Sequence, residues 1–164
     1  ARAAQRDGSR GYCRYINKVT HRYFNYIYVR IGEDTLLRKR SGEDVWKNLY
    51  EPLLIETNED VADNELPLVE ALDALFDKTS LYDSQSNALQ EGKRYFLMLK
   101  RRGLKHVLSH RVIHANFYEM TMPEEGPIPD GYFKVSAKDL QKYAVSNLVS
   151  QFFSLFLSPD NLNE

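Results

Sequence analysis

The feature that most constrains the fold is a run of alternating aromatic residues at positions 22–30. Every second position carries an aromatic side chain: Phe24, Tyr26 and Tyr28. This period-two pattern, with β-branched residues between, is typical of a half-buried β-strand. Residues 32–34 (Gly-Glu-Asp) have the composition of a tight turn, and residues 35–40 fit a returning strand. We therefore predict a β-hairpin at this point of the chain.

Two helices and further strands are expected beyond the hairpin. Residues 58–76 carry leucines at helical spacing, and Pro67 suits the first turn of that helix. A second helix is expected from Ser136, which has the composition of an N-cap followed by Asp139, and its apolar face runs to residue 155. Strands are expected at 95–99, 105–109, 112–122 and 132–135. The fold class is therefore α+β, with a mixed or antiparallel sheet.

The length of 164 residues is that of about one domain. We expect a linker or tail at 1–20, the folded domain at 21–157, an exposed polar loop at 78–92 and a C-terminal tail at 158–164. The single cysteine, Cys13, excludes an internal disulfide and supplies too few thiolates for a zinc or iron–sulfur site within this chain. No run approaches the roughly 20 apolar residues of a membrane span, and no signal-peptide pattern opens the chain.

The net charge of −1 hides a strong segregation of charge along the sequence. Residues 1–40 contain ten Lys or Arg and three acids, residues 56–77 contain eight acids and no base, and residues 93–114 contain seven Lys or Arg and no acid. A basic stripe opposed by an acidic face can steer a polyanion to one side of a protein. We expect the acidic run to be a solvated face turned away from any such partner.

Residues 105–114 hold the densest group of candidate functional side chains. His106, His110 and His114 are spaced to share one side of either a helix or a strand. No cysteine or carboxylate accompanies them, so hydrogen bonding to a polyanion or base fits as well as metal ligation, and we predict no metal site. Ser109 lies beside His110 without the sequence context of a nucleophile, and no phosphate-binding glycine motif occurs. No catalytic residue is therefore predicted.

Three segments together resemble a known family. They are RYFNYIYVR at 22–30, DVWKNLYE at 44–51 and KHVLSHRVIHANFYE at 105–119. In this order they resemble the C-terminal, Nudix-like domain of MutY-type adenine DNA glycosylases, over about residues 19–153. The resemblance implies a Nudix-like mixed β-sheet packed against helices. It also implies recognition of 8-oxoguanine paired with adenine, in base excision repair of DNA.

The resemblance implies a site as well. Leu108-Ser109-His110 is similar to the family's F-S-H loop, in which the serine bonds the purine edge of the lesion. Ser109 would contact the lesion with His110 beside it, and Leu108 would give apolar contact without the aromatic stacking of the family's Phe. Phosphate contacts are expected from four cations of the same stretch: Lys105, Arg111, Arg101 and Arg102.

The resemblance places the chemistry outside this chain. In the family, adenine excision belongs to an N-terminal glycosylase domain with an iron–sulfur cluster, so this stretch is expected to be a non-catalytic fragment without a cofactor of its own. Its expected partners are double-stranded DNA with 8-oxoguanine opposite adenine and that domain in cis, in a monomer of the bacterial cytoplasm without membrane contact.

Two alternatives stay open. The first is a stand-alone Nudix pyrophosphatase, although residues 59–76 lack the R-E-x-x-E-E core of such enzymes. The second is a non-enzymatic protein-interaction module.

Overall fold

The computed structural model of the protein describes residues 19–77 and 96–157. Its larger sheet has four strands in the order β4 (Leu53–Thr57), β1 (Thr20–Arg30), β6 (Arg111–Thr121) and β5 (Met98–Val107). The smaller sheet has the order β3 (Tyr50–Glu51), β2 (Asp34–Lys39) and β7 (Phe133–Ser136). Strand β1 is parallel to β6, and every other pair is antiparallel. The predicted α+β class with a mixed sheet is confirmed.

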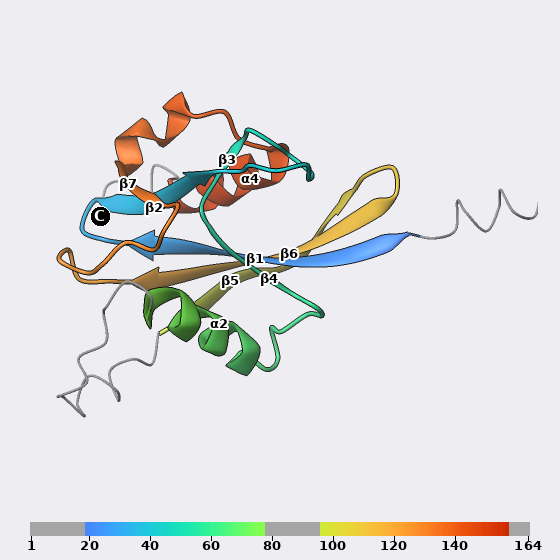
Figure 1. Ribbon diagram of the computed structural model, residues 1–164, viewed down its shortest axis with the longest axis horizontal. Coiled ribbons are helices and arrows are strands. Elements are labelled where there is room, and N and C mark those ends of the chain that lie inside the picture. The colour runs from blue at the N-terminus through green and yellow to red at the C-terminus, as the bar shows by residue number, and fades with distance from the viewer. Residues whose placement is uncertain (1–18, 78–95, 158–164) are drawn as a thin grey trace, which may run out of the picture.

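Both faces of the larger sheet are covered by other elements, as Figure 1 shows. Helix α2 (Leu66–Asp77) covers one face, and the smaller sheet with the 3₁₀ helix η1 (Ala137–Lys142) and helix α4 (Asn147–Phe156) lies on the other. Phe24 and Tyr26 pack in the core cluster that contains Phe152 of α4, whereas Ile27 packs in the cluster that contains Leu68 of α2. Strand β1 is therefore buried on both faces over residues 24–29.

The predicted hairpin is limited to its turn. Ile31 and Asp34 exchange two backbone hydrogen bonds of 2.9 Å around Gly32, whose φ is 61°. Beyond this bridge the two strands enter different sheets, so the prediction of a paired hairpin is wrong. Strand β1 pairs with β4 over residues 23–27 and with β6 over residues 20–30. Strand β2 pairs with β7 over residues 34–37 and with β3 at residues 38 and 39, so each strand has its partners in its own sheet.

Two other sequence expectations are corrected. The strands expected at 95–99 and 105–109 are one irregular strand, β5, whose pairing with β6 shifts register on both sides of Arg101. The single helix expected from Ser136 is broken, because Tyr143 is extended and Val145 bridges to Tyr50 before Ser146 caps α4. The extended segment is held by a hydrogen bond of 2.8 Å from Tyr50 N to the Ala144 carbonyl.

Several local predictions are confirmed. Ser136 is an N-cap that accepts from the Lys138 amide, and Pro67 lies in the first turn of α2. That helix begins at Leu66, later than the predicted 58, and Leu68, Leu72 and Phe76 form its buried face. Cys13, most of the predicted linker at 1–20, the loop at 78–92 and the tail at 158–164 lie outside the described residues. Among the helices that the structure describes, none is long and apolar enough to cross a membrane.

Candidate functional site

The turn that joins β5 to β6 carries the segment singled out in the sequence, Leu108-Ser109-His110. The Leu108 amide donates to the Arg111 carbonyl at 2.8 Å, and the Thr20 amide donates to the His110 carbonyl at 3.0 Å. In Figure 1 the ends of β1, β5 and β6 extend past the helices towards this turn. Ser109 and His110 are exposed, while Leu108 is half-buried against the core that contains Phe24. The turn is therefore anchored by Leu108 and presents the serine and histidine at the tip of the sheet.

A loop from residue 40 to residue 49 lies against this turn. The two segments line an open depression of about 460 Å³, formed by Glu43, Asp44, Val45, Leu108, Ser109, His110 and Arg111. Trp46 of the loop packs edge-on against Phe24 and His106, with ring centroids 6.2 and 5.4 Å apart. Its φ of 59° lies in the left-handed region, a conformation that only the surrounding contacts can impose on a tryptophan. The loop and the turn thus form one surface.

Asp44 is the centre of the contacts between loop and sheet. Its carboxylate accepts from Arg22 at 2.7 and 3.1 Å, from Arg40 at 2.8 Å, from Arg111 at 3.4 Å and from the Val45 amide at 2.7 Å. The hydrogen bonds from Arg22 hold the pKa of the Asp44 carboxyl well below its usual range. Because Arg22 belongs to β1 and Arg111 to β6, this one carboxylate links the loop to two neighbouring strands.

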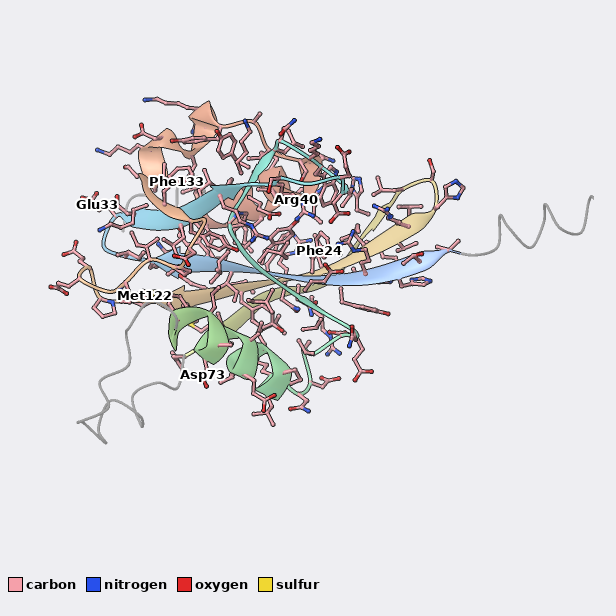
Figure 2. The ribbon with its side chains drawn as sticks, viewed as in Figure 1. Phe24, Glu33, Arg40, Asp73, Met122 and Phe133 are labelled. Carbon is pink, nitrogen blue, oxygen red and sulfur yellow. The ribbon has the colours of Figure 1, made fainter. Side chains whose placement is uncertain are left out.

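Arg40 and Glu51 extend this network into the interior. Arg40 donates to Glu51 at 2.9 Å and to the Val45 carbonyl at 2.9 Å, and Arg38 also donates to Glu51 at 2.8 Å. The Glu51 side chain is 1% exposed and that of Arg40 is 9% exposed, so this is a buried ion pair. Figure 2 shows Arg40 near Phe24, over whose ring its guanidinium lies at 5.7 Å. Arg22 also donates to Glu56, at 2.7 and 2.8 Å. We call Arg22, Arg40, Asp44, Glu51, Glu56 and Arg111 the Asp44 network.

The three histidines do not share one side of the sheet, and that prediction is wrong. The turn reverses the chain, so His106 of β5 lies opposite Ile113 and His114 of β6 lies opposite Lys105. Neighbouring residues of a strand point to opposite faces, which sends His106 to Trp46 and His114 to the other face. There, His114 stacks on Tyr23 at 4.7 Å, and its Nε2 lies 2.8 Å from Nδ1 of His21.

The four predicted phosphate contacts differ in their surroundings. Lys105 and Arg101 form no ion pair with any residue in 19–77 or 96–157, whereas Arg111 contacts Asp44 at 3.4 Å. Arg102 is paired with Asp60 at 3.3 Å and with Asp63 at 2.9 Å. Of the four, Lys105 and Arg101 therefore have no carboxylate of the described residues paired with them.

The acidic segment that precedes α2 contacts the basic strand β5. Asp60 accepts from the Asn116 amide group at 2.9 Å, and Asn116 accepts from the Gly103 amide of β5 at 2.9 Å. Together with the ion pairs to Arg102, these bonds attach residues 60–63 to β5 and β6. The pKa of the Asp60 carboxyl is lowered, because the hydrogen bonds it accepts outweigh the opposing effect of its desolvation.

Asp44, Arg22 and His21 were not selected from the sequence. The signal for Asp44 was weak but present, since an acid in a Ser-Gly-Glu-Asp turn precedes the only tryptophan and is flanked by strands that carry arginines. Nothing in the sequence indicates a contact between His21 and His114, which are 93 positions apart. The contact depends on the parallel pairing of β1 with β6. Within the described ranges no three His, Cys, Asp or Glu side chains form a group that could hold a metal ion.

Comparison with known proteins gives the fold. No protein-family model and no curated protein matches this sequence. Among solved structures, the C-terminal domain of mouse MUTYH, determined in complex with human PCNA, matches with a TM-score of 0.57 at 14% identity, over 82% of this chain and 86% of that one. The MutT protein of Methanosarcina mazei matches with a TM-score of 0.45 at 12% identity, over 90% of this chain and 98% of that one. The match to the MUTYH domain therefore shows a Nudix-like α+β fold for this chain.

Proposed function

We propose that this domain recognises 8-oxoguanine in DNA, opposite adenine, on behalf of an adenine DNA glycosylase domain in the same parent protein. The observation that carries the proposal is the position of Ser109, exposed at the tip of the sheet on a turn that Leu108 and the Asp44 network hold in place. A rigid support matters because a contact that discriminates between two bases must be held within a fraction of an ångström.

A serine hydroxyl suits the chemistry of this lesion. Relative to guanine, 8-oxoguanine gains a carbonyl at C8 and a proton on N7, so one acceptor becomes a donor beside a new acceptor. The hydroxyl of Ser109 can donate to the carbonyl and accept from N7–H. A direct contact to a base edge of this kind contributes about 1–3 kcal/mol of discrimination. We expect His110, its exposed neighbour, to contact the adjoining DNA backbone.

The four cations differ in what they can contribute to DNA binding. Lys105 and Arg101 have no competing carboxylate among the described residues and supply phosphate contacts that fix the register on the duplex without reading sequence. Of the three arginines on Asp44, Arg111 makes the longest contact, at 3.4 Å. It can also contact a phosphate, while Arg22 and Arg40 keep the Asp44 carboxylate paired. Arg102 is held by two carboxylates and contributes little.

The proposal is tested by competition binding with the 164-residue chain. A labelled duplex with 8-oxoguanine opposite adenine is displaced by the same duplex with or without the lesion. The wild type should prefer the lesion by about 1–3 kcal/mol, and Ser109→Ala should remove most of that preference while keeping overall affinity. Ser150→Ala, an exposed serine of α4, is the matched control and should keep it.

Two results would count against lesion recognition. Equal preference in Ser109→Ala and the wild type would show that the turn does not contact the lesion. Hydrolysis of nucleoside diphosphate derivatives with Mg²⁺, together with no lesion preference in the wild type, would instead favour a Nudix pyrophosphatase.

A further inference from the structure

The face of the larger sheet opposite the Asp44 network carries a second group of side chains near the β5–β6 turn. In the register of the sheet, Tyr23 lies beside His114, and His114 lies opposite Lys105. His21 is two residues before Tyr23 on β1 and therefore points to the same side. We call His21, Tyr23, Lys105 and His114 the histidine face. Its neighbour Val107 is 71% exposed, so the tip of this face is open to solvent.

The histidines of this face are directly coupled. His21 Nδ1 and His114 Nε2 lie 2.8 Å apart, and the two rings stack at 5.1 Å. His114 also stacks on Tyr23 at 4.7 Å, which fixes the orientation of its ring. A contact of 2.8 Å between two ring nitrogens requires one proton between them, so one ring donates and the other accepts.

This bond determines where the next proton goes. In the neutral pair, the accepting ring carries its own proton on its other nitrogen, and the donating ring leaves its other nitrogen bare. One added proton therefore binds that bare nitrogen without breaking the bond between the rings. The singly protonated pair then has one positive charge and two N–H groups that are not used within the pair. A second proton would remove the shared bond.

We propose that the histidine face binds a phosphate of the DNA backbone, and that the His21–His114 pair takes up one proton when the phosphate binds. The two free N–H groups point away from the shared bond, and either of them can donate to a non-bridging oxygen of a phosphodiester, in a hydrogen bond that the positive charge strengthens. Lys105 adds a second positive charge from the neighbouring strand. The proposal rests on the DNA binding proposed above but not on recognition of the lesion, which belongs to the Ser109 turn.

The charges around the pair give the direction of the pH dependence. His114 is faced by His21 and Tyr23 from β1, by Lys105 from β5 and by Asp60 from the segment before α2. Desolvation, with smaller effects of His21 and Lys105, lowers the pKa of His114 despite the opposing effect of Asp60. His114 is therefore neutral in the free protein at pH 7, and an anion that raises this pKa binds with proton uptake.

The test uses the 164-residue chain with undamaged duplex and, separately, with inorganic phosphate. Between about pH 8 and about pH 6, duplex affinity should rise by up to about tenfold per pH unit. His114→Gln and His21→Gln should each flatten this dependence. His106→Gln, which removes a histidine from the opposite face, should keep it.

Histidine NMR titrations separate the possible sources of the anion. A rise in the pKa of the pair with duplex but not with millimolar phosphate identifies the backbone as ligand, and a rise with both identifies a general phosphate site. No rise with either, or an unchanged pH dependence in both pair variants, would overturn the proposal. Because undamaged DNA is used, these outcomes do not depend on whether Ser109 distinguishes the lesion.

Discussion

Two clusters of ion pairs attach two loops to opposite faces of the same four-stranded sheet, and they differ in burial. The Asp44 network reaches from exposed Glu56 to Glu51, whose side chain is 1% exposed. The cluster of Arg102, Asp60 and Asp63 lies at the surface, with side-chain exposures of 46%, 40% and 84%. Exposed ion pairs contribute little to stability, whereas loss of one partner from a buried pair leaves an uncompensated charge. The Asp44 network therefore holds its loop in a fixed position against the sheet, and the Arg102 cluster mainly sets the local charge at the surface of β5.

The largest effect is expected from Glu51→Gln in the buried part of the Asp44 network. Two arginines, Arg38 and Arg40, lose their shared carboxylate, and Arg40 is almost fully buried. We expect a loss of about 3–5 kcal/mol in the free energy of unfolding, measured with urea. Glu70→Gln on the exposed side of α2 is the control and should change it by less than about 0.5 kcal/mol. Similar small losses in both variants would show that the pair is not buried in solution.

Asp44→Asn probes the same network at its half-exposed end. The folded pKa of Asp44 lies below its ordinary value of 3.8, chiefly because Arg22 donates to it. Its stabilisation is therefore complete above pH 3.8 and is lost as pH falls through the folded pKa. We expect Asp44→Asn to cost about 1.5–3 kcal/mol at neutral pH and progressively less in acid, as measured by urea unfolding across pH. A cost independent of pH would contradict this assignment.

These predictions could not have been made from the sequence alone, although much of the architecture could be predicted from it. The α+β class, the first turn of α2 and the Ser136 cap follow from local pattern. The divergence of β1 and β2 does not, because it depends on which strands occupy their edges. The Ser109 turn was found through a short motif, whereas its support by Asp44 depends on side chains from β1, β6 and a loop. The His21–His114 contact could not be predicted either, because it depends on the parallel pairing of β1 with β6, which leaves no local signal in the sequence.

The smallest effect on stability is expected from Asp63→Asn in the exposed cluster. The Asp63 carboxylate is at the surface, so the urea midpoint should not change measurably. Its effect should appear in DNA binding instead, because Arg102 is partly released. The slope of log affinity against log salt should steepen by up to about 0.9 for undamaged duplex. A large loss of stability with an unchanged salt slope would show that this cluster fixes geometry as the Asp44 network does.

The central claim is that the turn held by the Asp44 network contacts the lesion. Backbone amide NMR shifts of the 164-residue chain, compared between duplexes with 8-oxoguanine and with guanine opposite adenine, test it most directly. Phosphate contacts are common to both duplexes and cancel in this comparison. We predict that the largest differences fall at Ser109 and His110. Differences absent from the turn, or concentrated on α2 or α4, would contradict the account.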